Sequence, residues 1–210
     1  MMSNAQREAQ SISELLIATS NPGKVSEIET ALEGIPVSLC SLEDFPFIPP
    51  PVETGGTYSE NATLKANFYC RSTGKFALAD DSGLEVEALD GAPGILSARF
   101  GEVSSDQERI KLLLKRLSGI RYEDRRARFV CAISLAHPDT ELVKSFEGEI
   151  KGMIALTPKG SNGFGYDSIF IPDGYELTFG EMSSEVKNTI SHRARALANV
   201  RAFLKEWLQR

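Results

Sequence analysis

Apolar residues along the 210-residue chain alternate between short continuous runs and repeats at helical spacing. Short runs are typical of buried strands, and repeats at three and four residues are typical of amphipathic helices. Because the two signals alternate, the sequence predicts an α/β fold with a mixed central β-sheet flanked by helices. Strands are expected at residues 15–18, 36–40, 76–79, 127–136, 141–150 and 168–171, and helices after Asn21, over residues 57–72, after Ser105 and after Ser191.

Residues with capping chemistry mark several of the predicted helix ends. Asn21 is a favourable N-cap, and Pro22 suits the first helical position that follows it. Ser105 and Glu108 have the spacing of a capping box. Gly74 suits the C-terminal end of the helix expected over residues 57–72.

The composition favours one globular chain and argues against several partners. Residues 14–210 are expected to form a single domain, because no linker divides them, and the polar residues 1–13 are expected to form a disordered tail. No apolar stretch approaches the ~20 residues needed to cross a bilayer, so no membrane partner is expected. The net charge of -6 argues against a nucleic-acid partner. The odd number of cysteines, without metal-ligand spacing, predicts buried free thiols and a reducing cytoplasm: Cys40, Cys70 and Cys131.

The stretch Thr19–Lys24 (TSNPGK) resembles the end of a phosphate-binding P-loop. It lacks the first Gly of that motif, where Ala18 stands, and the hydroxyl residue after the Lys, where Val25 stands. A strand that leads into a helix N-terminus would still present free N–H groups and a positive dipole end to an anion. Lys24 would add a mobile cation. The alternative is an ordinary strand–turn–helix with a solvated lysine.

Two neighbouring aspartates, Asp80 and Asp81, follow the strand expected at residues 76–79, in the stretch DDSG. Ligands of open α/β sheets bind at strand ends, and successive strand residues point to opposite faces. One aspartate could therefore bind Mg²⁺ or accept a proton from water, while the other orders the loop. The alternative is a turn in which the carboxylates cap backbone N–H groups.

Further candidates lie at the start of the second helix and near the C-terminus. Glu60 falls in the first helical turn, where the favourable interaction of a negative charge with the helix dipole is enough to explain it. Glu53, Asn61 and Lys65 lie nearby in the sequence. Glu53 and Lys65 could belong to a binding site, or they could be ordinary solvated side chains. The stretch GFGYD, residues 163–167, could offer an aromatic stacking face, or its rings could pack in the core. Three cationic or polar donors could bind a keto oxygen or a phosphate, or form a solvated patch: Lys187, His192 and Arg193.

Five motifs together resemble the inosine triphosphate pyrophosphatases, the dITP/XTP or non-canonical purine NTP pyrophosphatases, and the bacterial branch most. In order, the motifs are TSNPGK, ENATLKA, ADDSGLEVEALDGAPGILSARF, GFGYDSIF and KNTISHRARAL, within residues 15–198. The resemblance implies two lobes around a deep active-site cleft and a homodimer in the cytoplasm. It also implies Mg²⁺-dependent hydrolysis of ITP, dITP and XTP to the monophosphate and pyrophosphate.

The resemblance also implies roles for individual residues. Asp81 would be the general base and, with Glu53, a magnesium ligand. The other positions would bind the purine nucleoside triphosphate: Thr19, Ser20, Asn21, Pro22, Gly23, Lys24, Lys65, Ser82, Phe164, Gly165, Tyr166, Asp167, Lys187, His192 and Arg193.

The chain departs from the family pattern at two positions. Ser20 stands where Gly is common, and Ser168 stands where Pro is common. Neither position is the proposed base or a metal ligand, so activity is expected. Two other functions fit the same residues: a phosphatase or kinase that acts at the γ-phosphate, and a non-catalytic purine-nucleotide sensor.

Overall fold

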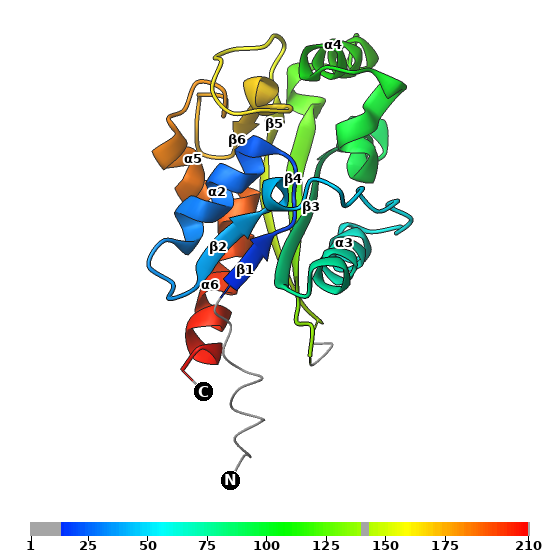
Figure 1. The fold of residues 1–210 in the computed structure, drawn as a ribbon. Helices are drawn as coiled ribbons and strands as arrows, with labels where there is room; N and C mark the ends of the chain where they lie inside the picture. Colours follow the sequence, from blue (N-terminus) through cyan, green and yellow to red (C-terminus); the bar gives the residue numbers. More distant parts are fainter. Residues whose placement is uncertain (1–13, 140–142, 210) are drawn as a thin grey trace. The chain divides into compact units, whose positions relative to one another are not determined.

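A computed structural model of the chain describes residues 14–139 and 143–209 (Figure 1). The predicted tail, residues 1–13, lies outside the described residues. The chain divides into two compact units, each built from separate segments. Unit 1 comprises the described residues of Met1–Asp81, Ala132–Glu147 and Ala196–Arg210; unit 2 comprises Ser82–Cys131 and Gly148–Arg195. The single domain and the cleft between lobes stay predictions.

The described residues contain a six-stranded sheet with the order β2-β1-β3-β4-β5-β6. Strand β1 pairs in parallel with β2 and β3, and Leu16 lies opposite Cys40 and Ala77. Strand β6 pairs antiparallel with β5. The sheet is therefore mixed, as predicted. The strands are β1 (Glu14–Ile17), β2 (Ser38–Ser41), β3 (Phe76–Val86), β4 (Arg126–Ala136), β5 (Val143–Ile154) and β6 (Phe170–Pro172).

Helices α2 and α4 begin at the capping residues that the sequence indicates, whereas the capping box of α3 was not predicted. Asn21 caps α2, Thr57 and Glu60 form a capping box on α3, and Ser105 and Glu108 form one on α4. The short helix α5, of seven residues, was not predicted, because its length gives little periodicity. The α-helices are α2 (Pro22–Leu32), α3 (Tyr58–Thr73), α4 (Asp106–Arg116), α5 (Ser184–Ile190) and α6 (His192–Trp207).

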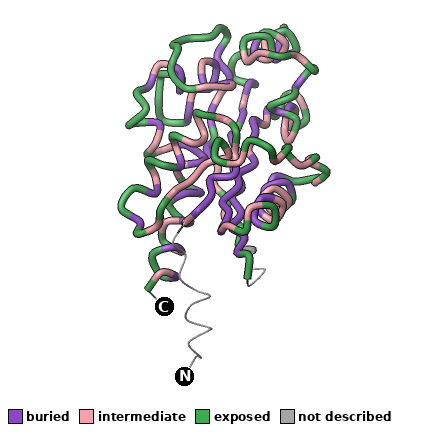
Figure 2. The backbone as a smooth tube through the Cα atoms, viewed as in Figure 1, coloured by how far each residue is buried: buried purple, intermediate pink, exposed green. Residues whose placement is uncertain are grey.

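One prediction about β3 is wrong: the strand does not end at Ala79. It continues for 11 residues through Asp80–Gly83 to Val86. Asp, Ser and Gly are common turn residues, but here the burial of almost the whole strand overrides that local preference. Figure 2 shows this run of buried backbone along the strands. The two aspartates are therefore strand residues, and the turn interpretation is excluded.

In unit 1, helices cover both faces of the sheet (Figure 1). The helix α3 packs Ala66 and Tyr69 against Ala77 and Ala79 of β3. On the other face, the ring of Trp207 in α6 lies edge-on to Phe76, with centroids 5.3 Å apart. The alternation of β3 therefore assigns odd-numbered residues to the α3 face and even-numbered residues to the other face.

An arginine of α6 donates hydrogen bonds to backbone carbonyls at the C-terminal end of α2. Arg201 Nη1 donates to the carbonyls of Ala31 and Glu33, at 2.9 and 2.6 Å. The last turn of α2 holds no basic residue of its own. A cation at a helix C-terminus interacts favourably with the dipole, so Arg201 satisfies the end of the helix whose N-terminus carries the TSNPGK stretch.

Unit 2 has its own apolar core, in which Phe129, Phe170 and Phe179 contact one another with ring centroids 4.7 to 6.3 Å apart. Leu113 of α4 and Tyr166 are buried in the same cluster. None of the three cysteines forms a disulfide, as predicted; Cys70 and Cys131 are buried, whereas Cys40, which was also predicted to be buried, is only half-buried.

The close pairing of β5 and β6 depends on Gly152. A Cβ atom at Gly152 would lie 2.2 Å from the carbonyl oxygen of Ile171 and 2.8 Å from the ring of Phe170. We expect Gly152→Ala to lower the free energy of unfolding by about 1–3 kcal/mol, because the backbone of β6 must move. Denaturant unfolding measures this loss. Gly56→Ala is the control, since its Cβ would meet only Glu60 Oε2 at 3.6 Å; an equal loss in both variants would contradict the argument.

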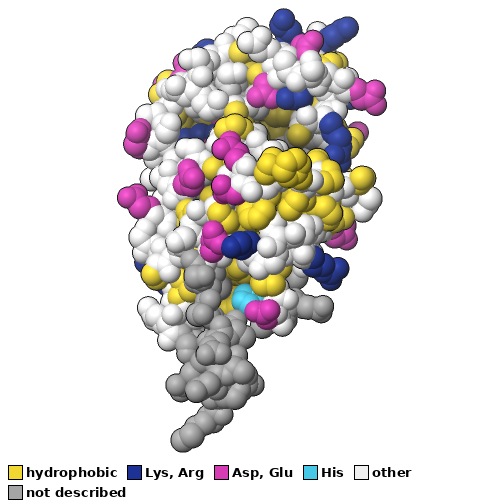
Figure 3. Space-filling model, viewed as in Figure 1, with side chains coloured by type: hydrophobic (Ala, Val, Ile, Leu, Met, Phe, Trp, Pro, Cys, Tyr) yellow, Lys and Arg dark blue, Asp and Glu magenta, His cyan; other side chains and the backbone are white. Residues whose placement is uncertain are grey.

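In the described part of the chain, no helix is both long enough and apolar enough to cross a bilayer. Basic and acidic side chains are interspersed on the face drawn in Figure 3.

Candidate active site

The N-terminus of α2 is capped by the side chain of Asn21. Its Oδ1 accepts hydrogen bonds from the backbone N–H groups of Gly23 and Lys24, at 2.9 and 3.2 Å. Thr19 Oγ1 accepts from the N–H of Asn21 at 3.3 Å. The prediction of free N–H groups is therefore wrong for these three positions, because capping side chains occupy them. The dipole of α2 remains as the attraction for an anion.

Lys24 is ion-paired and not a solvated side chain. Its Nζ lies 3.0 Å from Asp80 Oδ2, and the side chain of Asp80 is 0% exposed. The buried aspartate thus fixes the ammonium group beside the first turn of α2. Ser20, in the same stretch, is exposed.

The neighbouring aspartate, Asp81, lies on the α3 face of β3. Lys65 Nζ lies 3.0 Å from Asp81 Oδ1, and Asn61 Nδ2 donates to Asp81 Oδ2 at 3.2 Å. Asp80, on the opposite face, contacts α2 instead. The alternation predicted for the two aspartates is confirmed: each contacts the lysine of a different helix.

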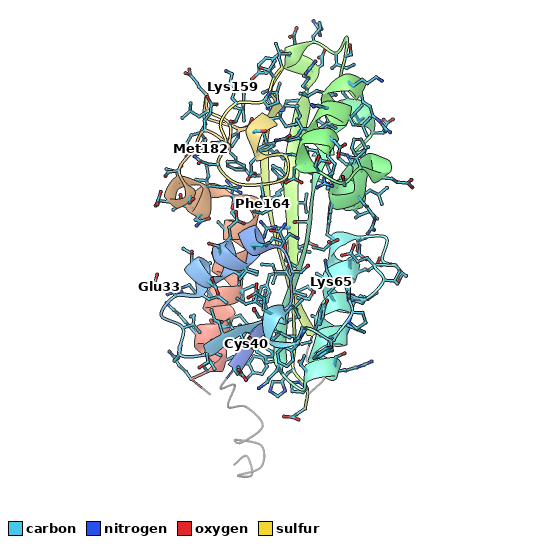
Figure 4. All side chains as sticks on the ribbon, turned by 45° about the horizontal axis from the view of Figure 1, so that its top comes forward. Glu33, Cys40, Lys65, Lys159, Phe164 and Met182 are labelled. Carbon is cyan, nitrogen blue, oxygen red and sulfur yellow. The ribbon has the colours of Figure 1, made fainter. Side chains whose placement is uncertain are left out.

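Lys65 also contacts Glu53, and the three side chains form one cluster, the Glu53–Lys65–Asp81 cluster. Lys65 Nζ lies 2.8 Å from Glu53 Oε1. The side chains of Lys65, Glu53 and Asp81 are 14%, 23% and 11% exposed. Figure 4 labels Lys65 on α3 beside β3. The structure excludes the solvated alternatives for Glu53 and Lys65 and brings the two predicted carboxylates onto one cation.

Burial and charge shift the pKa values of this cluster. Burial raises the pKa of Asp81, and the charge of Glu53 adds to the rise; the ammonium of Lys65 offsets it only in part. For Lys65, burial acts to lower the pKa, but the charges of Asp81, Asp80 and Glu53 outweigh it and raise the pKa. Lys65 is therefore charged, and Asp81 is a stronger base than an ordinary aspartate.

The cluster fits a magnesium ion by its chemistry. Mg²⁺ takes one or two protein carboxylates and completes its shell with water and substrate phosphates. Glu53 and Asp81 supply two carboxylates that already share a cation. Within the described residues, no group of three or more His, Cys, Asp or Glu side chains could hold a metal. A metal here would therefore rely on substrate oxygens for much of its shell.

Sequence reasoning placed Asn61 near Lys65 but assigned it no role in the site. Asn61 is fully buried, and its amide bonds on both sides: Oδ1 accepts from the N–H of Gly55 at 2.8 Å, while Nδ2 donates to Asp81. It thus links the loop after Glu53 to Asp81. The available signal was its spacing of four residues from Lys65, which assigns both side chains to one face of α3.

We expect Asn61→Asp to lower kcat roughly tenfold, with little change in KM. The variant keeps an acceptor for Gly55, but it loses the donor to Asp81 and places a second carboxylate beside it. A hydrogen bond to a charged group contributes about 1.5 kcal/mol or more, which corresponds to about tenfold in rate. Steady-state kinetics measures the change, and thermal melting shows whether the variant folds. A kcat within twofold of the wild type in a folded variant would remove Asn61 from the positioning of Asp81.

In unit 2, the loop of residues 163–167 turns around Asp167. Asp167 Oδ2 accepts from the N–H of Phe164 at 2.8 Å, and Gly165 N–H donates to Asp106 Oδ2 at 2.7 Å. Tyr166 is buried, and its hydroxyl donates to the carbonyl of Ser97 at 3.0 Å. Tyr166 therefore packs in the core, as one of the two interpretations of this stretch predicted. Phe164 is only half-buried.

The three predicted donors of unit 2 are all buried, and two of them, Lys187 and Arg193, lie over the ring of Phe164. Lys187 Nζ lies 2.5 Å from Asp167 Oδ2 and 4.6 Å from the centroid of the Phe164 ring. Arg193 Nη2 donates to Ser82 Oγ at 2.8 Å. His192 stacks on Phe129, with centroids 4.6 Å apart. The interpretation of a solvated cationic patch is therefore excluded.

Comparisons with known proteins find matches over most of the chain. A model of the Ham1 family matches residues 15–203. The dITP/XTP pyrophosphatase of Deinococcus deserti is 49% identical over 93% of this chain and 91% of its own. That of Bacillus licheniformis is 46% identical over 92% of this chain and 98% of its own. The solved HAM1 protein of Coxiella burnetii aligns with a TM-score of 0.83 at 38% identity, over 92% of this chain and 98% of its own.

Proposed function

Since the chain belongs to the Ham1 family, we propose that it hydrolyses non-canonical purine nucleoside triphosphates, namely ITP, dITP and XTP, to the monophosphate and pyrophosphate. The enzyme would thereby cleanse the nucleotide pool. The family match also confirms the resemblance that the five motifs indicated. The observation that carries the proposal is the Glu53–Lys65–Asp81 cluster, in which a buried carboxylate of raised pKa lies beside a second carboxylate and a charged lysine.

The triphosphate roles belong to residues of unit 1. The residues Thr19 to Lys24 and the dipole of α2 would attract the triphosphate, and Lys24 and Lys65 would neutralise its charge. Because capping occupies the N–H groups of Gly23 and Lys24, the lysine ammonium groups and the hydroxyls of Thr19 and Ser20 would make most direct contacts. Glu53 and Asp81 would hold Mg²⁺, which, when bound, offsets the negative charge of the phosphates.

The chemical step is attack of a water oxygen on the α-phosphorus. A new P–O bond forms, the bond to the bridging oxygen between the α- and β-phosphorus breaks, and pyrophosphate leaves. Asp81 accepts the proton of the water. Its raised pKa makes it better suited to this transfer than an ordinary aspartate. Asn61 orients its carboxylate through Oδ2.

The base roles belong to residues of unit 2. The ring of Phe164 would stack on the purine, and the loop through Gly165, Tyr166 and Asp167 would support the ring. Donors among Lys187, His192 and Arg193, with Ser82 held by Arg193, would face the 6-keto oxygen. Adenine presents an amino group there, so a buried donor would stay unpaired, which can reject an analogue by roughly 10⁴ or more.

The first test supplies purified protein and Mg²⁺ with ITP, XTP or ATP and assays pyrophosphate and orthophosphate separately. We expect pyrophosphate from ITP and XTP, with ATP spared. Orthophosphate would identify a γ-phosphatase, and binding of ITP without any product would identify a sensor; either result would overturn the proposal. We also propose a cytoplasmic homodimer without a nucleic-acid partner, for which light scattering during gel filtration gives the mass.

A further inference from the structure

Lys65 occupies the position of a bridging cation in the Glu53–Lys65–Asp81 cluster. Its single Nζ lies 2.8 Å from Glu53 Oε1 and 3.0 Å from Asp81 Oδ1. Both distances are those of charge-assisted hydrogen bonds. The same two carboxylates are the proposed magnesium ligands. The carboxylate oxygens that would bind the metal are therefore the same oxygens that contact the ammonium group of Lys65.

The charges explain why the two carboxylates need this contact. Glu53 and Asp81 would repel each other in a half-buried site without a cation between them, and removing one partner of a buried pair is costly. Lys65 comes from α3, which also supplies Asn61 to Asp81. The cation, its two carboxylates and the orienting amide therefore form one arrangement before any metal binds.

Lysine can make such a contact and also leave it. Its ammonium is a compact point charge on a flexible four-carbon stem with rotatable donors. A triphosphate offers it several anionic oxygens at once. Lys24 differs from Lys65, because its Nζ forms an ion pair with Asp80, on the other face of β3. The ion pair of Lys24 therefore does not involve either of the proposed metal ligands.

We propose that Lys65 is an internal cation that competes with the divalent metal for Glu53 and Asp81, so that the metal loads only when a triphosphate draws Lys65 away. The proposal rests on the proposed function, in which the two carboxylates bind the metal. Binding of the metal to Glu53 and Asp81 would then depend on the presence of the triphosphate. Linkage then requires that the metal raise nucleotide affinity by the same factor as the nucleotide raises metal affinity.

The experiment titrates Mn²⁺ into nucleotide-free protein and follows free Mn²⁺ by electron paramagnetic resonance. We expect Lys65→Met to bind Mn²⁺ at least tenfold more tightly than the wild type, because both carboxylates are released. Lys24→Met, the matched control, removes an ion-paired lysine of the same unit and is expected to change the Mn²⁺ affinity less than threefold. Equal or weaker binding by Lys65→Met would overturn the proposal.

A second titration repeats the first with a saturating ITP analogue whose α–β bridge is a methylene group, in the wild type and in Lys65→Met. The oxygens of the analogue ligate Mn²⁺ in both proteins, so the difference between the two reports the competition. We expect the analogue to raise the Mn²⁺ affinity of the wild type at least tenfold more than that of the variant, in which no lysine has to leave the carboxylates. Equal rises, after correction for Mn²⁺ bound by free analogue, would overturn the proposal. If both titrations succeed and ITP yields no pyrophosphate, the proposed function fails while the competition stands.

Discussion

Asp81→Asn is expected to lower the rate of pyrophosphate release from ITP by at least ~10²-fold, because the variant cannot accept the proton of the attacking water. Asn keeps the shape of Asp, but its single amide oxygen can accept from only one of the two donors, Lys65 and Asn61, that Asp81 binds with two oxygens. The loss should therefore fall on kcat more than on KM. Single-turnover measurements with Mg²⁺ and ITP isolate the chemical step. Near-normal turnover would remove Asp81 from the role of general base.

The stability of the same variant separates catalysis from folding. The pKa of Asp81 is raised above its ordinary value of 3.8, so the folded protein binds this proton more tightly than the unfolded chain. Its contribution to stability is therefore present at low pH and is lost as the pH rises through the raised pKa. Without metal, the melting temperature of Asp81→Asn relative to the wild type should be highest at neutral pH and should fall as the pH falls towards 3.8. A relative melting temperature that stays constant or rises as the pH falls would contradict this sign.

Lys187→Met is expected to lower the free energy of unfolding by about 3–5 kcal/mol, because it leaves Asp167 buried without its ammonium partner. The side chains of Lys187 and Asp167 are each 5% exposed, so solvent screens the pair little. For a chain of this size, the melting temperature should fall by roughly 6–20 °C. Calorimetry or denaturant unfolding measures the loss.

The double variant Lys187→Met with Asp167→Asn tests that interpretation. Removing both charges eliminates the uncompensated carboxylate, while the amide oxygen of the substituted side chain can still accept from the N–H of Phe164. The double variant should therefore recover a large part of the lost stability. If the losses simply add, the Lys187–Asp167 pair is not the cause, and the contact of the Lys187 ammonium with the ring of Phe164 explains the effect instead.

The helix starts were predictable because their signals are local. The caps at Asn21 and Ser105 depend on a side chain and a backbone group within three residues of each other. The resemblance to a family was also readable, since five motifs stand in one order along the chain. In both cases the evidence lies within short stretches of sequence.

The predictions that failed depend on distant contacts. The stretch Asp80–Gly83 has the residues of a turn, yet β3 continues because neighbouring strands and helices bury it. The sequence predicted free N–H groups at the start of α2, but the N–H groups of Gly23 and Lys24 donate to the side chain of Asn21. This was missed although Asn21 itself was predicted as the capping residue. The burial of Lys187 and Arg193 could not be read from residue type, because lysine and arginine are rarely buried unless paired.

The continuation of β3 through both aspartates also limits how the length of this segment can vary among relatives. A deletion or insertion of one residue between Phe76 and Asp80 would move every later side chain to the other face of the strand. Asp81 would then point towards α2, away from Lys65 and Asn61. Changes in length should instead be tolerated in the exposed, proline-rich loop of residues 45–52, where Phe47 is 96% exposed.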